Sequence, residues 1–189
     1  MVAASNCAVE AAYNDGASYW YRLNDDTTMV TKDWLTDFPN ALAGFTPPNV
    51  GIVGPVCKQG NTAILTYDFV HRSHFEIFGY QYPPSIQNWW CDNWVSLVYG
   101  PARTLRQQTQ EVRHLLTGTR YNVYRSDPKT HQSVPDSLLP TALNQGACKI
   151  DEYLDRLGGA AVPQTRQVTG TPVMSGREDR RATKTCRHP

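Results

Sequence analysis

Two neighbouring acids give this 189-residue sequence its first candidate for chemistry. Asp25 and Asp26 follow an aromatic run, Tyr19 to Leu23, that is typical of a buried strand. Open α/β sheets bind ligands at the carboxyl ends of their strands. Carboxylates at such a place can bind Mg²⁺ or Mn²⁺, and phosphate oxygens of a substrate then complete the coordination shell of the ion. The alternative interpretation is a polar turn, in which the same residue types are ordinary.

A third acid, Asp92, lies among three tryptophans in the segment Asn88 to Gly100, which predicts an amphipathic helix closed by glycine. Indole rings limit the water around a carboxylate, and reduced hydration raises its pKa toward the range of a general base. The structural alternative is an acid that interacts with the helix dipole. The sequence leaves both interpretations open.

The same segment offers an aromatic surface for a sugar. The apolar face of a sugar packs on aromatic rings, while its hydroxyls need polar partners such as Asp92 and Asn93. Tryptophans at helical spacing more often belong to a core, and Trp90 and Trp94 fit such a stripe. Trp89 is therefore the best candidate for a platform.

Three histidines are further candidates. His71 and His74 are three residues apart in a predicted helix over 69–78, so they share one face and could contact a substrate or a metal. A zinc pair on one helix is more typically spaced i, i+4, which disfavours a metalloprotease. Packing roles are the alternative for both. His114 lies in an alternating, strand-like segment and is a candidate metal ligand.

The predicted elements define the fold class. Strands are predicted over 18–23, 49–55, 62–66, 111–116 and 120–124, and helices over 6–13, 31–42, 69–78, 88–99 and 149–157. This order predicts an α/β fold with a mixed, mainly parallel sheet flanked by helices. We expect one domain over residues 1–160 and a disordered basic tail over 161–189.

Composition and missing motifs exclude several classes of protein. The formal net charge is +1, so no overall basic field indicates a nucleic-acid partner. No apolar run is long enough to be a membrane segment, and the sequence as written predicts a soluble chain. A signal or anchor further upstream would place it in the secretory pathway or the Golgi. The sequence lacks the usual motifs of serine hydrolases, P-loop proteins and Rossmann dinucleotide binders.

Three segments, taken in order, resemble glycosyltransferases of the GT-A nucleotide-diphospho-sugar superfamily. They are YWYRLNDDT from Tyr19, the glycine-rich and aromatic stretch from Val50 to Pro84, and NWWCDNWVSLVYGP from residue 88. The resemblance covers residues 5 to about 124 and depends on the combination of an acidic strand end, a Gly-Pro strand and a carboxylate-bearing tryptophan helix.

This resemblance implies a donor site at Asn24, Asp25 and Asp26, which match an Asp-any-Asp motif whose first acid is Asn here. Asp26 would bind Mn²⁺ or Mg²⁺ that bridges the donor diphosphate. A histidine near the carboxyl end often completes the metal shell in the superfamily, and His114 is the match. The implied donor is a nucleotide-sugar, a UDP-sugar first of all.

The resemblance also implies that Asp92 deprotonates the acceptor hydroxyl and that the transfer inverts the anomeric configuration. The acceptor would be a glycan or a protein. The expected acceptor-binding residues are Trp89, Trp90, Asn93, His71 and His74. Only some 23 residues precede the acidic motif, so we expect the chain to be the carboxyl-terminal part of such a domain, without part of the amino-terminal nucleotide-binding half.

Two other hypotheses remain open. A carbohydrate-binding pseudoenzyme would keep the aromatic cleft and lack turnover, which the short amino-terminal half motivates. A metal-dependent hydrolase would need Asp25, Asp26, His71 and His74 to converge, and nothing in their spacing requires this.

Overall fold

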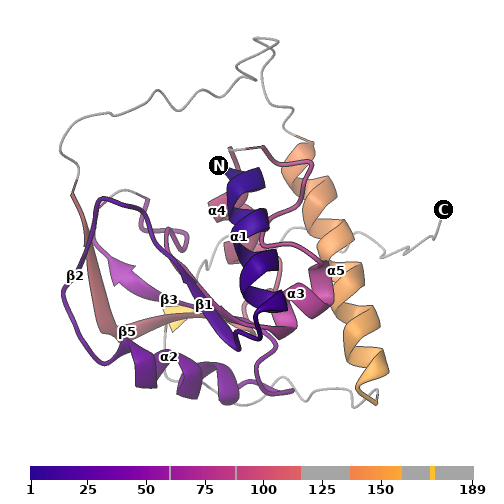
Figure 1. Cartoon of the computed structure of the whole chain (residues 1–189), viewed down its shortest axis with the longest axis horizontal. Helices are drawn as coiled ribbons and strands as arrows, with labels where there is room; N and C mark the ends of the chain where they lie inside the picture. Colours follow the sequence, from indigo (N-terminus) through magenta and orange to yellow (C-terminus); the bar gives the residue numbers. More distant parts are fainter. Residues whose placement is uncertain (60, 88, 116–136, 159–170, 173–189) are drawn as a thin grey trace, which may run out of the picture.

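The computed structural model describes residues 1–59, 61–87, 89–115, 137–158 and 171–172. These residues form a mixed sheet with helices on both faces (Figure 1). In chain order the elements are α1 (Val2–Asn14), β1 (Tyr19–Arg22), β2 (Thr27–Met29), α2 (Trp34–Ala43), β3 (Ile52–Cys57), β4 (Asp68–His71), α3 (Ser73–Phe78), α4 (Cys91–Leu97), β5 (Thr104–His114), α5 (Leu138–Arg156) and β6 (Thr171–Pro172).

The strand order is β1-β4-β3-β5-β2, and β6 pairs with β5 beside this path. Only β3 and β5 run parallel among these pairs, and the other pairs are antiparallel. The predicted α/β class and mixed sheet are confirmed, but the prediction that the sheet is mainly parallel is wrong. A short connection leads from β3 into β4, and such a connection gives antiparallel pairing because a parallel pair needs a long crossover.

The sheet separates two hydrophobic clusters, since successive residues of a strand face opposite sides. Val53, Phe69 and Leu105 belong to a cluster with Phe38 and Leu42 of α2. The neighbouring strand residues Ile52 and Val70 belong to the other cluster, together with side chains of α3, α4 and α5. Figure 1 accordingly shows α2 below the sheet and α1, α3, α4 and α5 gathered on its other side.

Several predicted element boundaries are wrong. Residues 62–66 form no strand, and the helix predicted over 69–78 begins only at Ser73 because Asp68–His71 is β4. All four residues of β4 pair with β1, so sheet pairing overrides the local helical pattern. α1 begins at Val2, which places Asn6 inside the helix and not at its cap. The predicted strand over 120–124 and the basic tail lie outside the described residues, apart from the short β6.

The register between β2 and β5 is held by polar contacts around Thr31. This residue starts the helix predicted over 31–42 but lies before α2 in the structure. Its hydroxyl donates to Gln110 Oε1 (2.6 Å) and accepts from the Glu111 backbone N–H (2.9 Å). Gln110 in turn donates to Asp37 of α2 (2.6 Å). These contacts keep β2 beside the carboxyl end of β5, where Thr27 lies opposite His114.

A tight contact at Gly54 of β3 gives a prediction for stability. A Cβ added there would lie 2.5 Å from the Tyr67 carbonyl oxygen and 2.8 Å from Leu65 Cδ2. We expect Gly54→Ala to lower the free energy of unfolding by about 1–3 kcal/mol, because backbone has to move. Urea denaturation measures this. The control is Gly44→Ala at the end of α2, where the nearest atom would be 3.3 Å away; equal losses in both variants would contradict the prediction.

Candidate functional site

One edge of the sheet, which we call the carboxyl edge, collects polar residues from distant parts of the sequence. β1, β3 and β5 end there at Arg22, Cys57 and His114, and β4 begins there at Asp68. Asp26 precedes β2 at the same edge, since the next residue of the chain lies opposite His114. Strand register alone therefore places the predicted acidic motif beside the predicted histidine.

Asp26 and His114 form the first half of the candidate site. Asp26 Oδ1 lies 3.0 Å from His114 Nε2, and their side chains are 28% and 19% exposed. The Asp26 backbone carbonyl accepts from the Leu115 N–H (2.8 Å), which fixes the loop against β5. Within the described residues Oδ1 is a buried oxygen with no partner of hydrogen-bond geometry, so the contact to His114 has the distance of an ion pair but not the angles of a hydrogen bond.

The residues present fit a divalent cation. Carboxylate oxygen and imidazole nitrogen are ligand types that Mn²⁺ accepts. Two adjacent ligands of an octahedral ion, each about 2.1 Å from it, are about 3 Å apart, which is the separation of Asp26 Oδ1 and His114 Nε2. In the described part of the chain no group of three or more His, Cys, Asp or Glu could hold a metal. A cation here would therefore need phosphate oxygens or water as further ligands.

Asp92 lies in the first turn of α4, as expected, although this helix is shorter than predicted. Trp90 enters the helix with a left-handed backbone (φ 81°), which is strained for a tryptophan. The Ser96 hydroxyl donates to the Asp92 carbonyl (2.6 Å) and accepts from the Leu65 N–H (2.8 Å). These bonds connect α4 to the segment before β4. The Asp92 side chain is 30% exposed.

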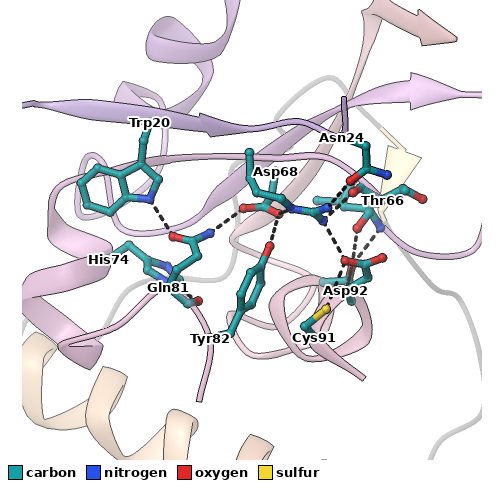
Figure 2. Close-up of polar contacts among 12 residues, drawn as sticks. Trp20, Asn24, Thr66, Asp68, His74, Gln81, Tyr82, Cys91 and Asp92 are labelled. Atoms are coloured by element: carbon teal, nitrogen blue, oxygen red, sulfur yellow. Dashed lines mark hydrogen bonds and ion pairs between the residues drawn. The ribbon is translucent and has the colours of Figure 1, made fainter. Parts of the chain in front are cut away.

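The side chains of Asn24, Asp68 and Asp92 converge (Figure 2), and Arg22 joins all three. Its Nη2 donates to Asp92 Oδ1 (2.7 Å), its Nη1 to Asn24 Oδ1 (3.2 Å) and its Nε to Asp68 Oδ2 (2.9 Å). Nη2 also donates to the Thr66 carbonyl. One guanidinium thus holds the acidic loop, the start of β4 and the candidate base together.

Asp68, the first residue of β4, is a further site residue that the sequence did not point to. Its carboxylate is fully buried and also accepts from Gln81 Nε2 (2.6 Å) and Tyr82 Oη (2.8 Å). Trp20 Nε1 donates to Gln81 Oε1 (2.6 Å), and Asn6 Oδ1 accepts from the Gln81 and Tyr82 backbone N–H groups at 3.0 and 2.9 Å. The sequence did contain one signal for such a partner: Arg22 lies in an aromatic run that is typical of a buried strand, and a buried arginine needs an acidic partner.

The electrostatic environment of Asp92 combines opposing effects. Burial raises the pKa of Asp92, the carboxylate of Asp68 raises it further, and the guanidinium of Arg22 opposes both. The net direction of the Asp92 pKa shift is upward. Burial also raises the pKa of the neighbouring Cys91 thiol to about 12, so this thiol stays protonated at neutral pH.

Trp89, Trp90 and Asn93 flank Asp92 in sequence and are partly buried. Trp89 and Trp90 meet edge to face, with ring centroids 6.0 Å apart. Trp94 is fully buried, as the core stripe predicts, and its indole N–H donates to the Ala142 carbonyl (3.1 Å). The partly exposed Trp89, Trp90 and Asn93 therefore remain the candidates for acceptor contact.

His71 and His74 do not share a helical face, which corrects the prediction from their spacing. His71 ends β4 on the side away from the carboxyl edge, where its ring packs edge-on against Tyr19 (5.0 Å between centroids). His74 has no exposed surface, and its nitrogens contact Tyr99 Oη and the Gln81 carbonyl, each at 3.0 Å. His71 thus lies at the other end of β4 from the carboxyl edge and His74 is fully buried, so the four residues of the hydrolase hypothesis do not converge.

Comparison with known proteins adds no assignment. No family model matches the chain, and no curated protein or solved structure matches it. Among the described residues, no helix has the length and apolar character needed to cross a membrane.

The burial of His74 predicts a pH dependence of stability. Burial lowers the pKa of His74 to about 4, whereas an unfolded histidine titrates near 6.5. Between these values the unfolded chain binds the additional proton, so the free energy of unfolding falls as the pH decreases from about 6.5 to about 4. Neutral His74 contributes up to about 3 kcal/mol to the free energy of unfolding, and this contribution is fully present above about pH 6.5.

Urea unfolding at a series of pH values measures this dependence. We expect His74→Gln to flatten the pH dependence, since glutamine can still bond to Tyr99 and Gln81 and does not titrate. His71→Gln is the matched control and should keep most of it, because His71 is only partly buried. Identical pH slopes for the wild type and His74→Gln would show that another group is responsible.

Proposed function

We propose that this chain carries the metal-binding and base-bearing part of a metal-dependent glycosyltransferase. The reaction transfers a sugar from a nucleotide-diphospho-sugar to an acceptor hydroxyl with inversion. One observation carries the proposal: Asp26 and His114, which the resemblance selects as metal ligands from opposite ends of the motif region, lie 3.0 Å apart. Arg22 joins the loop that bears Asp26 to Asp92, the acid selected as the base.

On the donor side, Asp26 and His114 would hold Mn²⁺ or Mg²⁺ through an oxygen and a nitrogen. Such an ion, when bound, would offset the charge of the leaving diphosphate. Arg22 holds Asn24 by its side-chain oxygen, which leaves the amide NH₂ of Asn24 for a ribose hydroxyl or water. The exposed Asp25 lies next to Asp26 and completes the donor-binding loop.

On the acceptor side, Asp92 takes the proton of the attacking hydroxyl. The acceptor oxygen forms a bond to the anomeric carbon while the bond from that carbon to the diphosphate oxygen breaks, and the proton moves to the Asp92 carboxylate. Its partial exposure gives the acceptor access, and its raised pKa makes it a better proton acceptor than an ordinary surface carboxylate. Trp89, Trp90 and Asn93 supply the surface on which a glycan or a protein segment rests.

The carbohydrate-binding pseudoenzyme is the competing outcome. It needs the tryptophans and neither the cation nor the base. Glycan binding without metal, weakened by Trp89→Ala and unaffected by Asp92→Asn, would favour it over the transferase.

The metal site is tested by titrating Mn²⁺ into the purified chain and following the electron paramagnetic resonance signal of free Mn²⁺. We expect Asp26→Asn and His114→Gln each to weaken Mn²⁺ binding about tenfold or more, since even residues that only support a ligand have effects of this size. UDP binding, measured by calorimetry, should require the metal. Asp33→Asn, an exposed acid before α2, is the matched control. Mn²⁺ affinity that is unchanged in both site variants would exclude this metal site.

The base is tested by transfer from UDP-sugars to glycan acceptors. Asp92→Asn should slow transfer about 100-fold or more while leaving the Mn²⁺ and UDP affinities unchanged, because a general base contributes only to the chemical step. Proton NMR of the product should show the anomeric configuration opposite to that of the donor. Undiminished transfer by Asp92→Asn, or a product with retained configuration, would contradict the role of Asp92.

A further inference from the structure

Arg22 is one positive charge between two carboxylates, and the three groups differ in exposure. The side chain of Asp68 is fully buried, that of Arg22 is 13% exposed and that of Asp92 is 30% exposed. Both carboxylates are within ion-pair distance of the guanidinium, at 2.9 and 2.7 Å. A buried arginine with two acids leaves one negative charge in excess, and the more exposed acid is the one that can take up a proton.

Hydrogen bonds donated by neighbouring side chains hold the Asp68 carboxylate in place. The Trp20 indole N–H can only donate, so Gln81 presents its oxygen to Trp20 and its NH₂ to Asp68. Tyr82 and Arg22 also donate to Asp68. Three donors thus converge on one buried carboxyl group. Asp68 thus anchors the guanidinium and keeps its direction constant.

The Asp92 end is held through one oxygen. Arg22 Nη2 donates to Oδ1 at 2.7 Å, and the Cys91 thiol contacts the same oxygen at 3.6 Å. Both contacts fall on Oδ1 of a partly exposed carboxylate, which leaves Oδ2 as the oxygen that neither of these two groups contacts. The oxygen that would receive a proton is therefore selected by Arg22.

We propose that Arg22, anchored by Asp68, is the positioning residue of Asp92: it holds Oδ1 and so fixes which oxygen accepts a proton and at which pH. The inference rests on the proposed function for naming Asp92 the base, whereas the linkage itself is independent of it. The groups that face Asp92 are Arg22 from β1, Asp68 from β4, Tyr82 behind Asp68 and Cys91 from α4.

The linkage predicts pKa changes of opposite sign. Arg22→Gln removes the positive charge and leaves Asp92 near the carboxylate of Asp68, so the pKa of Asp92 should rise by about one pH unit or more. Asp68→Asn removes the competing carboxylate and leaves the guanidinium to Asp92 alone, so the pKa of Asp92 should fall. Loss of packing alone would not move one titration in opposite directions.

The experiment is a carbon-13 NMR titration of the Asp92 carboxyl in the full chain, with the signal assigned by its loss in Asp92→Asn. Arg106→Gln is the matched control, since Arg106 is a part-buried arginine whose Nη2 donates to the Ile64 carbonyl (2.8 Å). It should leave the Asp92 titration unchanged. If Arg22→Gln does not fold, because Asp68 is left buried without its counter-charge, the downward change in Asp68→Asn decides the question alone.

An Asp92 titration that stays at the wild-type pH in these variants, or that moves in one direction in both, would overturn the linkage. The measurement needs no metal, donor or acceptor. Opposite changes in a chain without transfer activity would therefore support the linkage and reject the proposed function. Unchanged Asp92 titrations in variants of a chain that does transfer sugar would reject the linkage and leave the proposed function supported.

Discussion

The buried ion pair of Arg22 and Asp68 is the contact on which the site depends. A guanidinium in this position is costly without a carboxylate, and the β1–β4 register places Arg22 opposite Asp68. Asp68 is kept in place by Gln81 and Tyr82. With one side of Arg22 fixed in this way, its two Nη groups reach Asn24 and Asp92, so a structural ion pair gives both halves of the site their positions.

The sheet supplies the remaining geometry. Because β3 and β5 are parallel and both are separated from β1 by antiparallel β4, three strands end at the carboxyl edge. β2 pairs with the last residues of β5, which brings Asp26 to His114. The helices fix the other components, since α4 presents Asp92 and α1 holds the Gln81–Tyr82 segment through Asn6.

The sequence predicted the local features and missed those that depend on pairing. The strand at Tyr19 and the helix containing Phe38 were found because their residue patterns are local. Residue type and position made Asp26, Asp92 and His114 candidates, and the resemblance assigned their roles. The residues of β4 fall in the helix predicted over 69–78, because the histidine spacing suits a helix, and only pairing with β1 decides otherwise. The roles of Arg22 and Asp68 stayed hidden because each needs a partner distant in sequence.

The central claim is that the metal ligands and the base belong to one site, and paramagnetic broadening tests it most directly. Bound Mn²⁺ broadens carbon-13 signals of nearby groups, whereas Mg²⁺ does not. The account predicts that Mn²⁺ broadens the Asp92 carboxyl signal in the wild type and that Asp26→Asn abolishes this broadening, while Mg²⁺ leaves the signal sharp. An Asp92 signal that stays sharp when Mn²⁺ is bound would contradict a single site.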